Sequence, residues 1–366
     1  MSNHLWVRAE TKALEQRCGL SSESAKELVA RGFKVTVEQS DLSCFDSVLF
    51  ENAGCELVAS GSWRQAPDKA FILGLKELPE SDVPLNHRHI YFAHAYKGQQ
   101  GWQELLMRFH KGGGILFDLE YLEDPPGRRV ATFGYWAGFA GAALAVLAWV
   151  HRQTNAVSDF ACADSYPEKE SLIDDVKSHL TECVSAPRVM VIGAAGRCGL
   201  GASELLNSLG LDLTCWDIEE TRRGGPFNEI LDHDIFINCV FVSEPIQPFL
   251  THDSLARPRR LSVICDVSCD PLSAVNPLPI YHQTTSFNHP TVRVADGEPV
   301  VDLIAIDHLP SMLPAESSAS FSEQLLPYLC QLDDLRQGVW AAAKRKFDEM
   351  AALAKEASST RVGEQL

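Results

Sequence analysis

The turn Gly193-Ala194-Ala195-Gly196-Arg197-Cys198-Gly199 constrains the fold of this chain more than any other stretch. A short β-branched run, 189–192, precedes the turn, and an apolar-periodic segment, 202–209, follows it. A second strand-like run, 211–216, then stops at Asp217. The order strand, glycine turn, helix, strand and acid is typical of a dinucleotide-binding βαβ unit.

The residue types in this turn suit a dinucleotide. Glycines let the backbone approach a pyrophosphate without an intervening Cβ atom, and the N-terminus of the following helix attracts its negative charge. Asp217, about 24 residues beyond Gly193, would accept hydrogen bonds from the adenosine ribose. The glycines Gly193, Gly196 and Gly199 are spaced three apart, with Ala195 where the usual pattern has its second glycine. An ordinary strand-to-helix turn therefore remains the alternative.

The 366 residues suffice for two domains, and strand-like runs alternate with helix-like ones on both sides of residue 130. We expect an α/β protein with two Rossmann-like domains, parallel sheets and an active-site cleft between them. Residues 1–132 together with 315–366 would form the discontinuous substrate-binding domain, because the mostly helical segment 321–354, interrupted by Pro327, is expected to fold back. Residues 133–314 would form the NAD-binding domain.

Residues 130–150 form a run of 21 uncharged residues that contains Gly134 and Gly138 as a GxxxG pair. Its length fits a transmembrane helix. However, the run stands alone between two α/β patterns and is rich in Ala and Gly, as a fully buried helix would be. We expect a soluble interdomain helix.

Charge and cysteine usage exclude several classes of protein. The net charge of -17 argues against nucleic acid and anionic membranes as partners. Eleven cysteines without a CxxC pair give no support for a zinc ribbon or a secreted disulfide framework, and no metal site is expected. A redox disulfide between Cys198 and Cys239 is left open. With no signal peptide expected, the predicted compartment is the cytoplasm.

Three consecutive strand-like runs of the first domain end at polar side chains. Lys76 follows the first run, His94 the second and Glu120 the third. Each could be an ordinary surface or structural residue, but three adjacent strands would bring all three to one sheet edge. An acid near a lysine and a histidine would hold their charges and adjust their pKa values. The sequence therefore predicts an acid–base site at this edge.

Arginines stand out in so acidic a chain. Arg17, Arg128 and Arg129 could be solvated surface residues, or they could clamp carboxylates with bidentate hydrogen bonds.

Motifs along nearly the whole chain resemble those of the NAD-dependent, lysine-forming saccharopine dehydrogenases, relatives of alanine dehydrogenase and of the transhydrogenase nucleotide-binding subunit. The matching stretches are 74–77, 92–99, 119–122, 127–130, 138–143, 192–199, 224–227, 266–270 and 306–310.

The resemblance implies roles for individual residues. Lys76 and His94 match the acid–base pair, and Glu120 matches an acid that adjusts it. Positions that match saccharopine contacts are Arg17, Lys97, Gln99, Arg129, Phe133, Ser268, Cys269 and Asp270. Positions that match cofactor contacts are Arg128, Gly196, Arg197, Asp217, Phe241, Val267, Ile306, Asp307, His308 and Leu309, with Gly193 in the turn. One further contact falls on either Thr221 or Arg222.

The implied reaction converts saccharopine, NAD and water to lysine, 2-oxoglutarate and NADH, or the reverse, in lysine metabolism by the aminoadipate route. NAD is expected rather than NADP, because Asp217 would repel a 2′-phosphate, although Arg222 and Arg223 nearby act against this preference. The expected partners are these small molecules, with the protein a monomer. The alternatives are an alanine-dehydrogenase-like oxidoreductase and, further off, a non-catalytic NAD-binding module.

Overall fold

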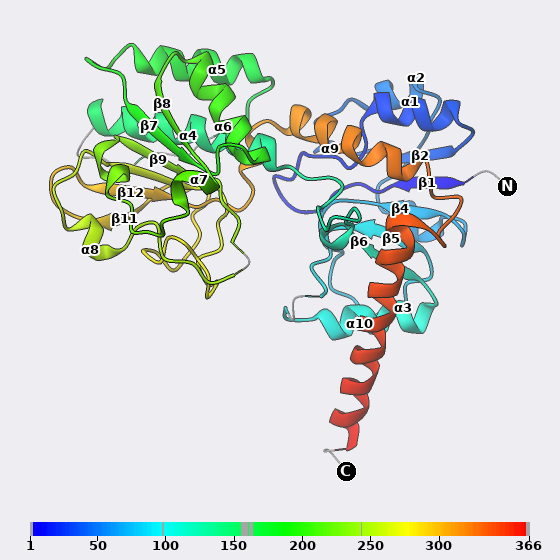
Figure 1. The fold of residues 1–366 in the computed structure, drawn as a ribbon. Coiled ribbons are helices and arrows are strands. Elements are labelled where there is room, and N and C mark those ends of the chain that lie inside the picture. Colours follow the sequence, from blue (N-terminus) through cyan, green and yellow to red (C-terminus); the bar gives the residue numbers. More distant parts are fainter. Residues whose placement is uncertain (1–2, 97–98, 155–159, 161–163, 243, 364–366) are drawn as a thin grey trace. The chain divides into compact units, whose positions relative to one another are not determined.

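A computed structural model describes residues 3–363, apart from 97–98, 155–159, 161–163 and 243 (Figure 1). The chain divides into two compact units, residues 1–132 with 317–366 and residues 133–316. The first boundary lies where the sequence placed it, and the second lies two residues later. Each unit contains a six-stranded sheet whose strands are almost all parallel, so the expected α/β class with two Rossmann-like domains is confirmed.

The sheet of the first unit has the order β3-β2-β1-β4-β5-β6, and every neighbouring pair is parallel. Its strands are β1 (His4–Val7), β2 (Lys34–Glu38), β3 (Glu56–Val58), β4 (Phe71–Leu73), β5 (Arg88–Tyr91) and β6 (Ile115–Asp118). Its helices are α1 (Ser22–Ala30), α2 (Ser47–Asn52), η1 (Ser62–Gln65), α3 (Trp102–Gly112), η2 (Leu119–Tyr121), most of α9 (Pro314–Leu329) and α10 (Gly338–Gly363).

Both faces of this sheet are covered by helices (Figure 1). On one face, Trp6 and Tyr91 belong to a cluster that includes Phe109 of α3 and Phe347 of α10. On the other face, α9 is tied to the loop after β1, because the hydroxyl oxygens of Ser318 and Ser322 accept hydrogen bonds from backbone N–H groups of Cys18 and Ser21. Burial on two faces is the usual situation of a parallel sheet.

The C-terminal segment differs in detail from the expectation. Pro327 lies inside α9 without ending it, and the break comes between α9 and α10, at residues 330–337. The segment nevertheless belongs to the first unit, which is therefore built from both ends of the chain.

The sheet of the second unit has the order β11-β12-β10-β9-β7-β8, in which only the β11–β12 pair is antiparallel. Its strands are β7 (Arg188–Ile192), β8 (Asp212–Trp216), β9 (Ile235–Asn238), β10 (Val263–Asp266), β11 (Val292–Ala295) and β12 (Val301–Ile304). Its helices are α4 (Gly134–Thr154), α5 (Lys169–Leu180), α6 (Arg197–Ser208), α7 (Ile218–Thr221), η3 (Asn228–Asp232), α8 (His252–Leu255) and η4 (Leu309–Met312).

Alternate residues of β7 enter two different cores. Val189 and Val191 pack with α4, α5 and α6, whereas Met190 and Ile192 pack under the segments around Phe227 and Phe249. This period of two is what a strand buried on both faces requires. β7 lies between the outermost strand β8 and its other neighbour β9.

The long apolar helix α4 belongs to the core of the second unit and is not the interdomain helix we expected. It is long and apolar enough to cross a membrane, but 72% of its most apolar 18-residue window is buried inside the protein. Its glycines explain the composition, because α4 and α6 approach backbone to backbone. A Cβ atom added to Gly138 would lie 1.8 Å from the carbonyl oxygen of Cys198, and one added to Gly201 would lie 1.9 Å from that of Tyr135.

Candidate active site

Lys76, His94 and Glu120 follow β4, β5 and β6, which are adjacent in the sheet. The carboxyl ends of parallel strands meet at one edge, so the predicted gathering of three polar residues is a property of the fold. All three side chains are partly buried. The structure thus provides an amine, an imidazole and a carboxylate at one sheet edge.

The backbone at Lys76 is held by two buried charged residues that follow β1. The carboxylate of Glu10 accepts hydrogen bonds from the N–H groups of Leu75 and Lys76 at 2.7 and 3.0 Å, and Arg8 donates to the carbonyl oxygen of Lys76. Gly74 lies against them, because a Cβ atom there would be 2.3 Å from Nε of Arg8 and would displace this guanidinium. Three hydrogen bonds therefore hold the backbone that presents Lys76.

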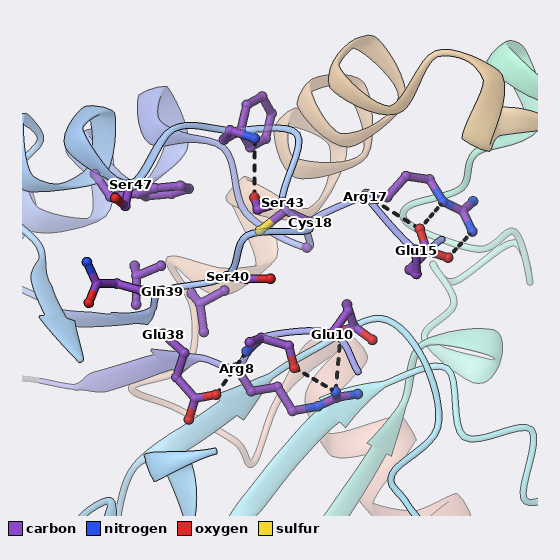
Figure 2. Close-up of a pocket in the computed structure, with 16 residues that line it drawn as sticks. Arg8, Glu10, Glu15, Arg17, Cys18, Glu38, Gln39, Ser40, Ser43 and Ser47 are labelled. Atoms are coloured by element: carbon purple, nitrogen blue, oxygen red, sulfur yellow. Dashed lines mark hydrogen bonds and ion pairs between the residues drawn. The ribbon is translucent and has the colours of Figure 1, made fainter. Parts of the chain in front are cut away.

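The Lys76 amine forms an ion pair with Glu15. Nζ of Lys76 lies 3.9 Å from Oε2 of Glu15, whose two oxygens also accept hydrogen bonds from Arg17 at 2.8 and 2.7 Å (Figure 2). Burial acts to raise the pKa of Glu15, but the hydrogen bonds and charge of Arg17 and the charge of Lys76 outweigh it and leave the pKa lowered. Glu15 is thus a carboxylate at neutral pH. Sequence reasoning missed it, because no pattern connects residues 61 positions apart.

Glu120 has a different ionic partner from the one we expected. Its carboxylate accepts a hydrogen bond from Arg129 at 2.8 Å, and the Arg129 side chain is 42% exposed while that of Glu120 is 14% exposed. The structure therefore places the acid at the expected edge but pairs it with a candidate substrate-binding arginine. Its influence on Lys76 and His94 stays a prediction.

A small polar pocket lies beside these groups, between the ends of β1 and β2 (Figure 2). Arg8, Glu10, Glu15, Arg17 and Glu38 line it, and its volume is about 30 Å³. That is room for one or two water molecules and not for an amino acid.

His94 has an unusual backbone conformation. Its φ of 51° lies in the left-handed region, which residues other than glycine rarely adopt. Its ring is stacked on that of Phe92, with centroids 6.2 Å apart and planes at 23°. The last residue of β6, Asp118, holds the backbone on both sides of His94 through hydrogen bonds from Ala93 and Ala95.

The candidate substrate contacts fall in both units. In the first, Arg17 is buried against Glu15, Gln99 and Arg129 are exposed, and Lys97 lies outside the described residues. In the second, Phe133 is partly buried just before α4, and Ser268, Cys269 and Asp270 form the loop after β10.

The loop after β10 is organised by Asp266, a residue to which we assigned no role. One carboxylate oxygen of Asp266 accepts a hydrogen bond from the hydroxyl of Ser268 at 2.6 Å, and the other accepts one from Tyr281 at 2.7 Å. Cys269 adopts a left-handed φ of 52°. The position of Asp266, an acid at the end of an otherwise apolar strand, was the sequence signal that it holds this loop.

The glycine turn after β7 has the conformation that a pyrophosphate needs. Gly193 has a φ of 88°, and a Cβ atom at Gly199 would lie 2.1 Å from the carbonyl oxygen of Gly193. Gly196 is the N-cap of the 12-residue helix α6 and provides no side chain there. A phosphate can therefore approach the positive end of this helix dipole.

Asp217 directly follows β8 beside this turn, at the position where the sequence placed it. Its carboxylate accepts a hydrogen bond from the N–H of Ala195 at 2.8 Å and caps α7. Near it, a pocket of about 460 Å³ is lined by Thr221, Arg222 and Phe241 among others. Thr221 and Arg222, the two alternatives for one cofactor contact, thus line the same pocket. Phe241 is 75% exposed.

The remaining candidate cofactor contacts are less uniform. Arg128 is exposed and binds Asp124, and Arg197 and Asp307 are exposed, whereas Val267 and His308 are partly buried. Ile306 and Leu309 are each 1% exposed, and their roles as cofactor contacts stay predictions.

No disulfide joins Cys198 to Cys239 in the part of the chain that the structure describes. Burial raises the pKa of Cys239 well above its ordinary value.

Comparisons with known proteins agree with this geometry. Residues 6–140 match the family described as alanine dehydrogenase/PNT, N-terminal domain, and residues 227–357 match its C-terminal domain. The NAD(+), L-lysine-forming saccharopine dehydrogenase of Schizosaccharomyces pombe is 48% identical over 360 residues, covering 95% of this chain and 98% of that protein. The enzyme of the same name from Neurospora crassa is 49% identical over 366 residues, covering 97% and 98%.

Two solved structures resemble the fold. A transhydrogenase from Sinorhizobium meliloti has a TM-score of 0.64 at 17% identity, covering 93% of this chain and 97% of its own. An L-alanine dehydrogenase has a TM-score of 0.63 at 17% identity, covering 95% and 99%. At such identities the likeness concerns the fold alone.

Proposed function

This chain belongs to the NAD-dependent, L-lysine-forming saccharopine dehydrogenases, and from that premise we propose how its residues divide the reaction. The enzyme oxidises saccharopine with NAD and water to lysine, 2-oxoglutarate and NADH, or runs the same reaction in reverse. The observation that carries the proposal is the placement of Lys76 and His94 at the ends of the adjacent strands β4 and β5.

Lys76 is the base that takes the proton from the secondary amine of saccharopine. Its loop is held by Glu10 and Arg8, so the amine starts from a defined position. Arg17 occupies both oxygens of Glu15, and Lys76 at 3.9 Å is too far for a direct hydrogen bond to that carboxylate. The amine can therefore turn toward a substrate while a fixed negative charge stays beside it.

His94 acts after oxidation of the C–N bond. It assists the addition of water to the resulting substrate imine and then protonates the departing lysine amine as the carbinolamine collapses. One positioned acid or base of this kind typically contributes about 10²–10⁴-fold in rate. Glu120 acts through Arg129. Saccharopine carries three carboxylates, and Arg129 is more exposed than Arg17 and so more accessible to one of them.

The residues of the second unit fit NAD. Gly193, Gly196 and Gly199 would hold the pyrophosphate, and Asp217 would bind the adenosine ribose. Thr221, Arg222 and Phe241 would enclose the adenosine in the 460 Å³ pocket. When bound, the nicotinamide supplies the hydride chemistry, and the protein provides position and charge.

A spectrophotometric assay tests the assignment. NADH consumption should require lysine together with 2-oxoglutarate, and pyruvate with ammonia should not replace them. A preference for pyruvate and ammonia would establish the alanine-dehydrogenase-like alternative instead. We also propose that the protein acts as a monomer without a membrane partner, so it should sediment as a single 40.3 kDa species without detergent.

A further inference from the structure

Asp118 is a buried acid with three backbone partners. It is the last residue of β6, and only 1% of it is exposed. One carboxylate oxygen accepts hydrogen bonds from the N–H groups of Ala93 at 3.2 Å and Glu120 at 3.1 Å, and the other accepts one from Ala95 at 3.1 Å. A single carboxylate thus holds the loops after β5 and β6.

Two of these donors flank His94, the residue with a φ of 51°. A residue with a Cβ atom disfavours this left-handed conformation. It keeps that conformation only where surrounding contacts hold its backbone in place. The hydrogen bonds from Ala93 and Ala95 supply that constraint, because they anchor the backbone immediately before and after His94 to two oxygens of the same rigid group.

We propose that Asp118 is a positioning residue for His94. Asp118 holds the imidazole at the sheet edge because it fixes a backbone conformation that the loop would not otherwise keep. The proposal rests on the acid–base role proposed above for His94. Asp118 does not touch the substrate in this scheme. Its carboxylate acts through the loop, and both of its oxygens are needed.

The first measurement is the turnover of Asp118→Asn. Asparagine keeps the shape of aspartate but has one accepting oxygen, so at least one of the bonds beside His94 or Glu120 is lost. We expect kcat to fall by about 10–100-fold, since a displacement near 1 Å can have that effect. The dissociation constant of NADH should be unchanged, because the glycine turn and Asp217 lie in the other unit.

Asp234→Asn is the matched control. Asp234 is 9% exposed, and its carboxylate accepts hydrogen bonds from the backbone N–H of Arg188 at 2.9 Å and from Arg260 at 3.1 Å. It precedes β9 at the opposite, amino end of the second sheet. Loss of this buried carboxylate should lower stability and leave kcat unchanged.

A kinetic cycle with His94→Gln separates positioning from general damage. If Asp118 acts through His94, the double variant D118N/H94Q should turn over within about twofold of H94Q alone. If H94Q and D118N are both impaired but their losses multiply, or if D118N keeps normal kcat, the positioning proposal is overturned while the role of His94 stands. Near-normal turnover of H94Q would overturn both.

A stability cycle with His94→Gly needs no activity. Glycine adopts a positive φ readily, so the constraint on the backbone is no longer needed. D118N should therefore lower Tm less in the H94G background than in the wild-type background. An equal loss of Tm, or failure of D118N to fold in both backgrounds, would make Asp118 a general fold residue and would refute the proposal.

Discussion

Gly138→Ala is a test of the link between the buried helix α4 and the cofactor turn. The new Cβ atom would lie 1.8 Å from the carbonyl oxygen of Cys198 and 2.6 Å from its carbonyl carbon. Those atoms belong to the first turn of α6, which begins at Arg197. The clash is with backbone, so no side-chain rotation relieves it.

The expected loss of stability in Gly138→Ala follows from these distances. To bring the closest contact from 1.8 Å to 3.0 Å, the two helices must separate by about 1.2 Å. Overpacking of this kind costs about 1–3 kcal/mol, against which alanine gains up to about 1 kcal/mol in helix propensity. We expect a net loss of about 1–2 kcal/mol in the free energy of unfolding. The moved N-terminus of α6 should also raise the dissociation constant of NADH.

Gly141→Ala provides the control in the same helix. The three atoms nearest its new Cβ atom would be side-chain atoms of Leu309, Val267 and Cys265, at 3.1–3.2 Å, which need to move by only a few tenths of an ångström. Urea unfolding and NADH fluorescence titration of both variants would measure the two effects. If G138A were as stable as the wild type and bound NADH normally, or if G141A were the more damaged, the reasoning from backbone contact would be refuted.

The remaining predictions concern the site. Lys76→Met and His94→Gln should each lower turnover by about 10²–10⁴-fold with little change in NADH affinity. In a single turnover of saccharopine oxidation, the His94 variant should keep a residual burst of NADH that the Lys76 variant lacks, and near-normal turnover of both would place the acid–base pair elsewhere. NAD should be used with higher kcat/KM than NADP, because Asp217 repels a 2′-phosphate, and equal efficiencies would contradict that role. The pKa of Glu15 is lowered when folded, so its stabilisation is present above its ordinary pKa of 4.5 and is lost as the pH falls through the lowered value. Glu15→Gln should remove this pH dependence from urea unfolding and lower stability by about 3–5 kcal/mol at pH 7, since the buried Arg17 loses its ion pair with the Glu15 carboxylate. An unchanged dependence on pH would show that Glu15 is not the group responsible.

Features set by local pattern were predictable from the sequence. The glycine turn, its two strands and Asp217 follow from turn chemistry and the period of apolar residues, and they lie where expected. The convergence of Lys76, His94 and Glu120 required one more assumption, that consecutive parallel strands are neighbours. The order β4-β5-β6 satisfies it.

Features set by tertiary contact were not predictable. An apolar run indicates that a helix is buried but not which elements bury it. We therefore expected α4 between the two domains, whereas it packs within the second unit. The partner of Lys76 comes from a loop 61 residues earlier, and the partner of Glu120 is an arginine nine residues later. Asp118 and Asp266 each end an apolar strand, and that position could have marked both as loop-holding acids.

The construction of the first unit from both ends of the chain affects the order of events during synthesis. All six strands of its sheet are translated by residue 118, but α9 and α10, which cover it, come from residues 314–363. The second unit is one continuous segment, 133–316, and can fold while those residues are still being added. A nascent chain on the ribosome should therefore complete its dinucleotide-binding half first, and the cluster around Trp6 and Tyr91 should gain Phe347 only after α10 has been added.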